Sequence, residues 1–368
     1  MRHTYLLIAI LVAAAYQQSN AQGCVAIRSN GNTCSSGKAD AAKGYIFNLN
    51  TRYFKSYKHF VGTEEQHERV EEGTEVINHS LSFDFTLTKV VNKYWSFSVT
   101  LPLLSNVRSS MYEHYGNNST SPHARNNTRS FGIGDVRFSA YRWMFDPATS
   151  HKGNLQLGLG VKLPTGNYEV MDYFHKPTPA GGDSSVLGPV DQSIQLGDGG
   201  TGLSLELNGY YNFSSRVGFY GNFYYMANPG EQNGTSTSRG GSQSATNIRY
   251  FTTTMSIPDQ FMIRGGLGFA ATKNLHVSGG VRWEGIPSSD LIGGDKGFRR
   301  PGYVVSVEPT VSYMFKKANF YLSVPAAIQR NRTQSYSDKL RSEATGVHVQ
   351  GDAAFADYLI NVGFSIHL

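Results

Sequence analysis

The chain has 368 residues, of which 16% are charged, and it contains 40 glycines, 22 tyrosines and 21 phenylalanines. This composition is typical of a protein with many strands and weighs against one built from packed helices. The formal net charge is +6, but the basic residues are scattered over expected turns and loops, so we do not expect a nucleic-acid partner.

The N-terminus carries the features of a secretory signal peptide, which we place at residues 1–21. Arg2 and His3 precede an apolar run over residues 6–15, and small residues end at Ala21. The run is too short to cross a bilayer, and no later run approaches the ~20 apolar residues of a membrane helix. Residues 22–43 form an N-terminal segment that either lies in the periplasm or plugs the barrel that the following residues are predicted to form, as described below. The signal peptide implies export to an oxidising compartment, where we favour a disulfide between Cys24 and Cys34.

Two runs, over residues 76–87 and 95–103, alternate between apolar and polar side chains at most positions. Phe83 and Phe85, for example, alternate with Ser82 and Asp84. A period of two predicts extended strands with one apolar and one polar face. A soluble sandwich would bury the apolar face against a second sheet, whereas a transmembrane barrel turns it toward lipid.

The rest of the chain decides between these two folds. The pattern predicts twelve strands, at residues 44–57, 76–87, 95–103, 135–145, 154–163, 202–213, 217–226, 260–271, 275–285, 303–315, 320–328 and 357–368. Their connections alternate between long and short, as in a barrel with both termini in the periplasm. We also expect residues 250–257 to extend the following strand. The sequence therefore predicts an all-β, twelve-stranded antiparallel transmembrane barrel over residues 44–368, located in the bacterial outer membrane.

Three segments carry a family resemblance. GIGDVRFSAYR at residues 132–142 and GVKLPTGNY at residues 160–168 resemble the outer-membrane transporters named for the meta pathway of phenol degradation. RYFKSYKHFVGTEEQHER at residues 52–69, with the cysteine pair before it, resembles barrels of that type from Bacteroidetes. The resemblance implies a channel or transporter for aromatic or other hydrophobic compounds, and it supplies no substrate residues.

Charged residues in the inward phase of the strands are the candidate pore-lining residues, because a charge in a membrane wall must face water or a partner. They are Arg52, Asp84, Arg137, Lys162, Glu206, Arg282, Glu284 and Glu308. If each loop is symmetric about its midpoint, Lys162 lies opposite Glu206 and Arg282 lies near Glu308. These pairs either form a charged constriction that selects solutes or simply tie the wall together.

An outer-membrane phospholipase is a minor alternative. His79 and Ser105 are both in outward phase, and counting through the turn places them roughly opposite each other, as a base and a nucleophile would be. The simpler interpretation is that both are polar residues at strand ends.

The sequence thus favours a passive channel or transporter for small solutes that has no cofactor and no metal. Its expected partners are the solute, the outer-membrane lipid and lipopolysaccharide phosphates. The competing hypothesis is a sealed structural barrel whose long loops bind another molecule.

Overall fold

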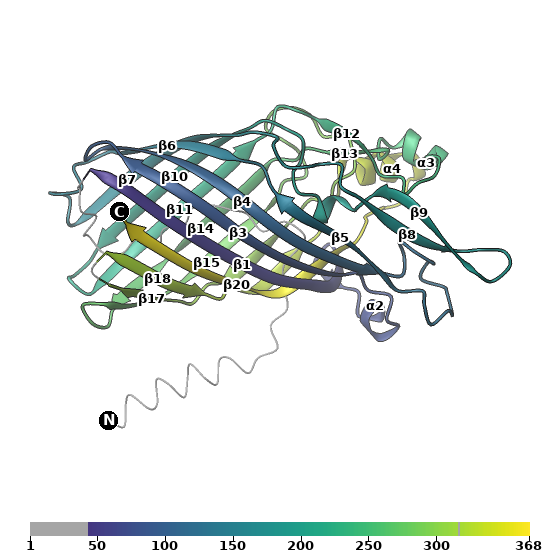
Figure 1. Cartoon of the computed structure of the whole chain (residues 1–368), viewed down its shortest axis with the longest axis horizontal. Helices are drawn as coiled ribbons and strands as arrows, with labels where there is room; N and C mark the ends of the chain where they lie inside the picture. Colours follow the sequence, from purple (N-terminus) through teal and green to yellow (C-terminus); the bar gives the residue numbers. More distant parts are fainter. Residues whose placement is uncertain (1–42, 316) are drawn as a thin grey trace, which may run out of the picture.

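The computed structural model describes residues 43–315 and 317–368, which fold into one closed barrel with a cap of loops at one end (Figure 1). Sixteen strands in this described part form the main sheet. Nine of them each form one wall strand without a break. They are β1 (Gly44–Val61), β3 (Ile77–Val90), β4 (Trp95–Ser110), β7 (Gly153–Lys162), β10 (Gly202–Asn212), β11 (Val217–Ala227), β14 (Gln260–Ala270), β15 (Leu275–Ile286) and β20 (Ala353–His367).

Three further wall strands are each built from two segments. These are β5 (Asn126–Ile133) with β6 (Arg137–Trp143), β16 (Gly302–Val307) with β17 (Thr310–Met314), and β18 (Ala318–Ser323) with β19 (Ala326–Asn331). The short β2 (Glu64–Glu65) only pairs with the end of β1. Strand β20 pairs with β1 from Ile46↔His367 to Phe60↔Ala353, and this pairing closes the ring. The prediction of a twelve-stranded antiparallel barrel is confirmed.

Proline explains why two predicted strands are broken. We expected continuous strands over residues 303–315 and 320–328, but each is interrupted, at Pro309 and at Pro325. Proline has no N–H to donate to a neighbouring strand and is therefore found at edges and breaks in sheets. Beyond the second break, Ala326↔Tyr358 is the one pairing between β19 and β20 in the described residues.

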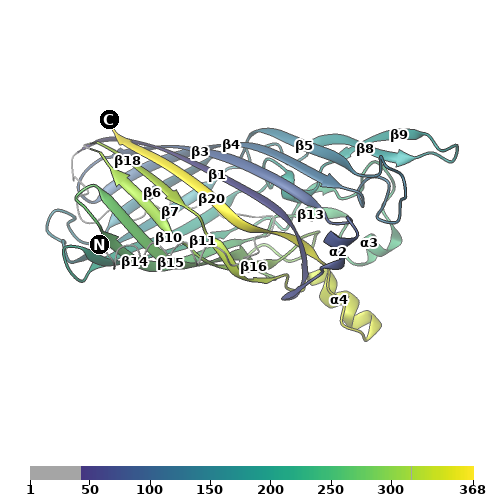
Figure 2. The same cartoon turned by 90° about the horizontal axis from the view of Figure 1, so that it is seen from below.

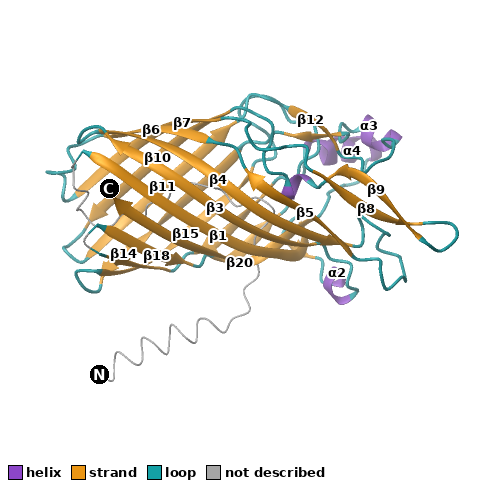
Figure 3. Cartoon of the chain, viewed as in Figure 1, coloured by secondary structure: helices purple, strands orange, loops and turns teal. Residues whose placement is uncertain are grey.

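The long loops gather at the end of the barrel opposite the C-terminus (Figures 1 and 3). They contain two hairpins and four short helical segments: β8 (Met171–Pro177) with β9 (Asp183–Pro189), β12 (Gln232–Ser236) with β13 (Thr254–Ser256), α2 (Glu68–Glu71), η1 (Gln192–Ile194), α3 (Ala245–Arg249) and α4 (Tyr336–Thr345). The expectation that residues 250–257 extend the next wall strand is wrong. Part of that segment is β13, which pairs with β12 because its backbone finds a nearer partner inside the same loop.

The two faces of the wall differ as the period of two predicts. Outward apolar side chains are exposed all around the ring: Leu87, Phe97, Leu159, Leu205, Phe219, Ile263, Val281, Val311, Leu322 and Val362. Inward polar side chains such as Thr86, Ser204 and Asn361 are buried. A soluble monomer rarely exposes a continuous apolar belt, so this belt faces lipid, and the short turns face the periplasm as in outer-membrane barrels. No helix in the described residues is long and apolar enough to cross a membrane.

Candidate functional site

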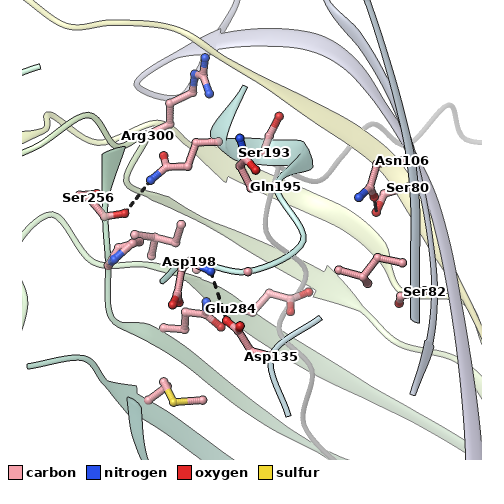
Figure 4. A pocket seen from close by; sticks show the side chains of 18 of the residues that line it. Ser80, Ser82, Asn106, Asp135, Ser193, Gln195, Asp198, Ser256, Glu284 and Arg300 are labelled. Carbon is pink, nitrogen blue, oxygen red and sulfur yellow. Dashed lines mark hydrogen bonds between the residues drawn. The ribbon is translucent and has the colours of Figure 1, made fainter. Parts of the chain in front are cut away.

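A cavity of about 210 Å³ lies inside the barrel, beneath the long loops, and we call it the chamber. Figure 4 shows Ser80, Ser82 and Asn106 on one side, from the adjacent strands β3 and β4. Its apolar lining includes Phe54, Leu104, Leu196, Met226, Met255, Ile286, Val304 and Phe355. The chamber therefore presents both apolar surface and hydrogen-bonding groups to any molecule inside it.

One wall of the chamber is made by a loop that folds into the barrel. In this loop, residues 190–200, Ile194 and Leu196 are buried, and the Ser130 hydroxyl donates a hydrogen bond to the Ile194 carbonyl. Gly166 permits the close approach, since a Cβ atom there would lie 2.6 Å from the Leu196 carbonyl oxygen. The sequence shows residues 164–201 only as a long loop, because an irregular segment carries no periodic signal.

Lys162 lies at the chamber wall close to two carboxylates, Asp135 and Asp198, which are labelled in Figure 4. We call Asp135, Lys162 and Asp198 the charge triad. Lys162 Nζ donates a hydrogen bond to Asp198 and lies 3.7 Å from Asp135. The Asp198 backbone N–H in turn donates to Asp135 at 3.2 Å. The triad carries one positive and two negative formal charges.

The expected pairing of Lys162 with Glu206 is wrong. Lys162 lies opposite Gly202, and Glu206 lies opposite Gly158 and accepts a hydrogen bond from Tyr141 Oη at 3.1 Å. The error arises because the register is fixed by the ladder of strand pairs and not by the midpoint of the loop. The slip is an even number of residues, so both side chains still point inward.

At the floor of the chamber, toward the short turns, inward charges form an ion-pair layer. Arg282 pairs with Glu284 at 2.8 Å and lies 3.9 Å from Glu308, so its expected proximity to Glu308 is found. Arg264 pairs with Glu308 at 3.3 Å. The sequence analysis missed Arg264, although its position next to the outward Ile263 in β14 predicts an inward side chain.

The remaining candidates also lie inside the barrel. Arg137 lies 3.9 Å from Asp84, and Arg52 Nε donates to Asn361 at 3.1 Å. Of the eight predicted residues, four line the chamber, namely Arg52, Arg137, Lys162 and Glu284. The other four lie deeper, namely Asp84, Glu206, Arg282 and Glu308.

A second charged cluster closes the loops over the chamber, and we call it the loop clamp. Arg108 Nε donates to Glu113 at 3.0 Å, and Arg239 pairs with the same carboxylate at 2.7 Å. Arg300 binds Asp191 with two hydrogen bonds, at 2.9 and 2.8 Å. Burial alone would raise the pKa of Asp191, but Arg108 and Arg300 hold it well below its usual value. The clamp thus joins four loops, and no local sequence pattern reveals these contacts.

The charges of the chamber, the ion-pair layer and the clamp cancel when the two deeper carboxylates, Asp84 and Glu206, are counted with them. The cations are Arg52, Arg108, Arg137, Lys162, Arg239, Arg264, Arg282 and Arg300, and the anions are Asp84, Glu113, Asp135, Asp191, Asp198, Glu206, Glu284 and Glu308. Together these residues have no net formal charge. A charged solute in the chamber would therefore meet groups that already compensate one another.

The geometry does not support a phospholipase site. Ser105 lies opposite Leu81, and His79 lies opposite Val107, so the two residues are diagonal neighbours on the outward face, roughly opposite each other as expected. His79 Nδ1 instead bonds the Tyr53 hydroxyl at 2.9 Å. The predicted signal peptide and the Cys24–Cys34 disulfide lie outside the described residues.

Comparisons with known proteins agree with this architecture. No protein-family model and no curated protein sequence matches the chain. An outer-membrane channel of Pseudomonas putida F1 superposes with a TM-score of 0.57 and 9% identity, covering 93% of this chain and 100% of that one. The translocator domain of an autotransporter from Neisseria meningitidis (TM-score 0.46, 11% identity, 90% and 91% coverage) and the toluene transporter of Ralstonia pickettii (0.43, 10%, 89% and 90%) superpose less well. At these identities the likeness establishes the fold alone, which is that of a bacterial outer-membrane barrel.

Proposed function

We propose that the chain is an outer-membrane channel for the passive uptake of small solutes that carry both an apolar ring or chain and a polar group. The observation that carries this proposal is the chamber inside the closed wall. A buried apolar cavity of about 150 Å³ in another protein holds one benzene molecule. The chamber, at about 210 Å³, has room for a single ring with a substituent.

The lining of the chamber supports this class of solute. Phe54, Leu104 and Phe355 offer apolar contact, while Ser80, Ser82 and Asn106 offer hydrogen bonds on the same inner surface. Ligand sites combine apolar walls with a few polar groups in this way. The resemblance of residues 132–142 and 160–168 to the transporters of the phenol meta pathway, and of residues 52–69 to those of Bacteroidetes, supports an aromatic compound as the solute.

A sealed barrel is the second candidate, and the ion-pair layer favours it. Arg282, Glu284 and Glu308 are each no more than 3% exposed, so the lumen is densely filled at the floor of the chamber. Twelve strands enclose a lumen between the filled interior of eight-stranded barrels and the open channel of porins. In the channel, these side chains must move to let a solute pass.

Flux through reconstituted protein separates the two candidates. Phospholipid vesicles that contain the purified mature chain would be tested by stopped-flow light scattering for swelling in benzyl alcohol, and in a trisaccharide as a size control. The channel predicts swelling in benzyl alcohol beyond that of protein-free vesicles, and none in the trisaccharide. Folded protein that adds nothing to the benzyl alcohol rate would support the sealed barrel.

A further inference from the structure

A group of aromatic and basic side chains lies on the outer loops, away from the chamber, and we call it the aromatic–basic patch. It consists of Arg249, Tyr250, Phe251, Lys296 and Arg341. The guanidinium groups of Arg249 and Arg341 lie 5.5 and 5.8 Å from the centre of the Tyr250 ring. Lys296 Nζ lies 5.0 Å from the centre of the Phe251 ring. Three different loops therefore place three cations on two neighbouring rings.

The three cations of the patch differ from the arginines of the loop clamp, because they have no carboxylate partner in the described part of the chain. Within residues 43–315 and 317–368, neither Arg249, Arg341 nor Lys296 forms an ion pair. In contrast, Arg299 and Arg300, which follow in the same loop as Lys296, bind aspartates at 2.7 and 2.8 Å. The patch therefore presents uncompensated positive charge at the outer surface.

The backbone of the patch supports a role in binding. Phe251 has φ of 56° and is the one non-glycine residue of the described chain with a positive φ. This conformation is unfavourable for a bulky residue, and such residues are often found at functional sites. Phe251 is 41% exposed and contacts Tyr336 at the start of α4, and the nearby Ile248 is 61% exposed. The loop thus holds apolar surface in solvent next to the cations.

We propose that the aromatic–basic patch binds the phosphorylated sugar head group of a glycolipid in the outer leaflet. Arginine donates paired hydrogen bonds to phosphate, and aromatic rings pack against the apolar faces of sugars. The position fits, because α4 begins five residues after β19 ends and extends beyond the outline of the barrel at its outer rim (Figure 2). A glycolipid of the outer leaflet surrounds the wall on the side from which α4 extends.

Native mass spectrometry of the mature chain in a neutral detergent tests the proposal. The protein would be titrated with bisphosphorylated lipid A and, separately, with lipid A from which both phosphates have been removed. The double variant Arg249→Gln/Arg341→Gln removes the two guanidinium groups from Tyr250. Arg142→Gln is the matched control, because Arg142 lies 5.9 Å from the Trp95 ring at the opposite end of the barrel.

We expect the double variant to bind bisphosphorylated lipid A roughly 25-fold more weakly, since each basic residue near an anionic surface contributes about fivefold. The control should bind as the wild type does, and gel mobility with and without heating shows that each variant is folded. Equal binding of the dephosphorylated lipid, or unchanged binding by the folded double variant, would overturn the proposal. Patch-dependent binding of poly-glutamate as tight as that of lipid A would also overturn it, in favour of an acidic protein partner.

Discussion

The charge triad gives the sharpest prediction about solute passage, because its neutral variants should change ion selectivity in opposite directions. Asp198→Asn removes one negative charge from the chamber wall and retains the side-chain oxygen that accepts a hydrogen bond from the Gly200 N–H at 2.9 Å. Lys162→Gln removes the positive charge and leaves Asp135 and Asp198 without a cation. The first variant should favour anions and the second should favour cations.

The size of the effect follows from the distances. Lys162 Nζ and Asp135 are 3.7 Å apart, and an ion in the chamber can approach either group at a similar distance. Two unit charges 4 Å apart interact by about 1 kcal/mol in water and about 4 kcal/mol at an effective dielectric constant of 20. Even the lower value shifts the ratio of anion to cation permeability about fivefold.

Reversal potentials in planar bilayers under a KCl gradient measure this ratio. Wild-type protein should show weak selectivity, because the charges around the chamber cancel. Asp198→Asn should raise the chloride-to-potassium ratio at least about fivefold, and Lys162→Gln should lower it. If both variants shift the ratio in the same direction, or neither shifts it, ions do not pass the triad and our reasoning about the chamber fails.

Two further predictions concern stability. Gly363→Ala would place a Cβ atom 1.8 Å from the Tyr321 ring, so we expect a loss of about 1 to 3 kcal/mol in the free energy of unfolding, measured with urea in detergent. Gly279→Ala is the control, since it meets nothing within 4 Å, and an equal loss there would contradict the argument. Burial lowers the pKa of His114 to about 4, and its Nδ1 accepts a hydrogen bond from the His175 N–H at 3.0 Å. A histidine in the unfolded chain has a pKa near 6.5, so the fold favours the neutral form of His114. This preference contributes roughly 3 kcal/mol to the local stability around His114, complete above pH 6.5 and declining as the pH falls toward 4. Hydrogen exchange of the His175 amide, corrected for its intrinsic rate, should show less protection at pH 5 than at pH 7.5, and constant protection would refute this.

The alternation of apolar and polar residues was sufficient to predict the number of wall strands and the two faces of the wall, but it did not predict β5. All eight candidate charges lie inside the barrel, because a shift of register by an even number of residues does not change the face of a side chain. The pairing of Lys162 was predicted wrongly for the same reason, since alternation defines a face but does not define which residue lies opposite. The breaks at Pro309 and Pro325 could have been predicted, because proline interrupts a ladder.

The loop clamp and the inward loop could not have been predicted from periodicity. Arg108 and Arg239 meet the same carboxylate although 131 positions separate them in the sequence. Their contact depends on how four irregular loops fold together. No regular spacing connects such residues, so the site above the barrel is visible only in the structure.

The central claim is that solutes pass through the chamber, and blocking the chamber tests it most directly. Ser82 lines the chamber, so Ser82→Cys, in a chain with Cys24 and Cys34 replaced by serine, places a thiol there. The swelling rate of vesicles in benzyl alcohol would be measured before and after reaction with a bulky maleimide. We predict that the thiol reacts and that the protein-dependent swelling is lost. Full labelling with an unchanged swelling rate, or a thiol that does not react in folded protein, would contradict the account.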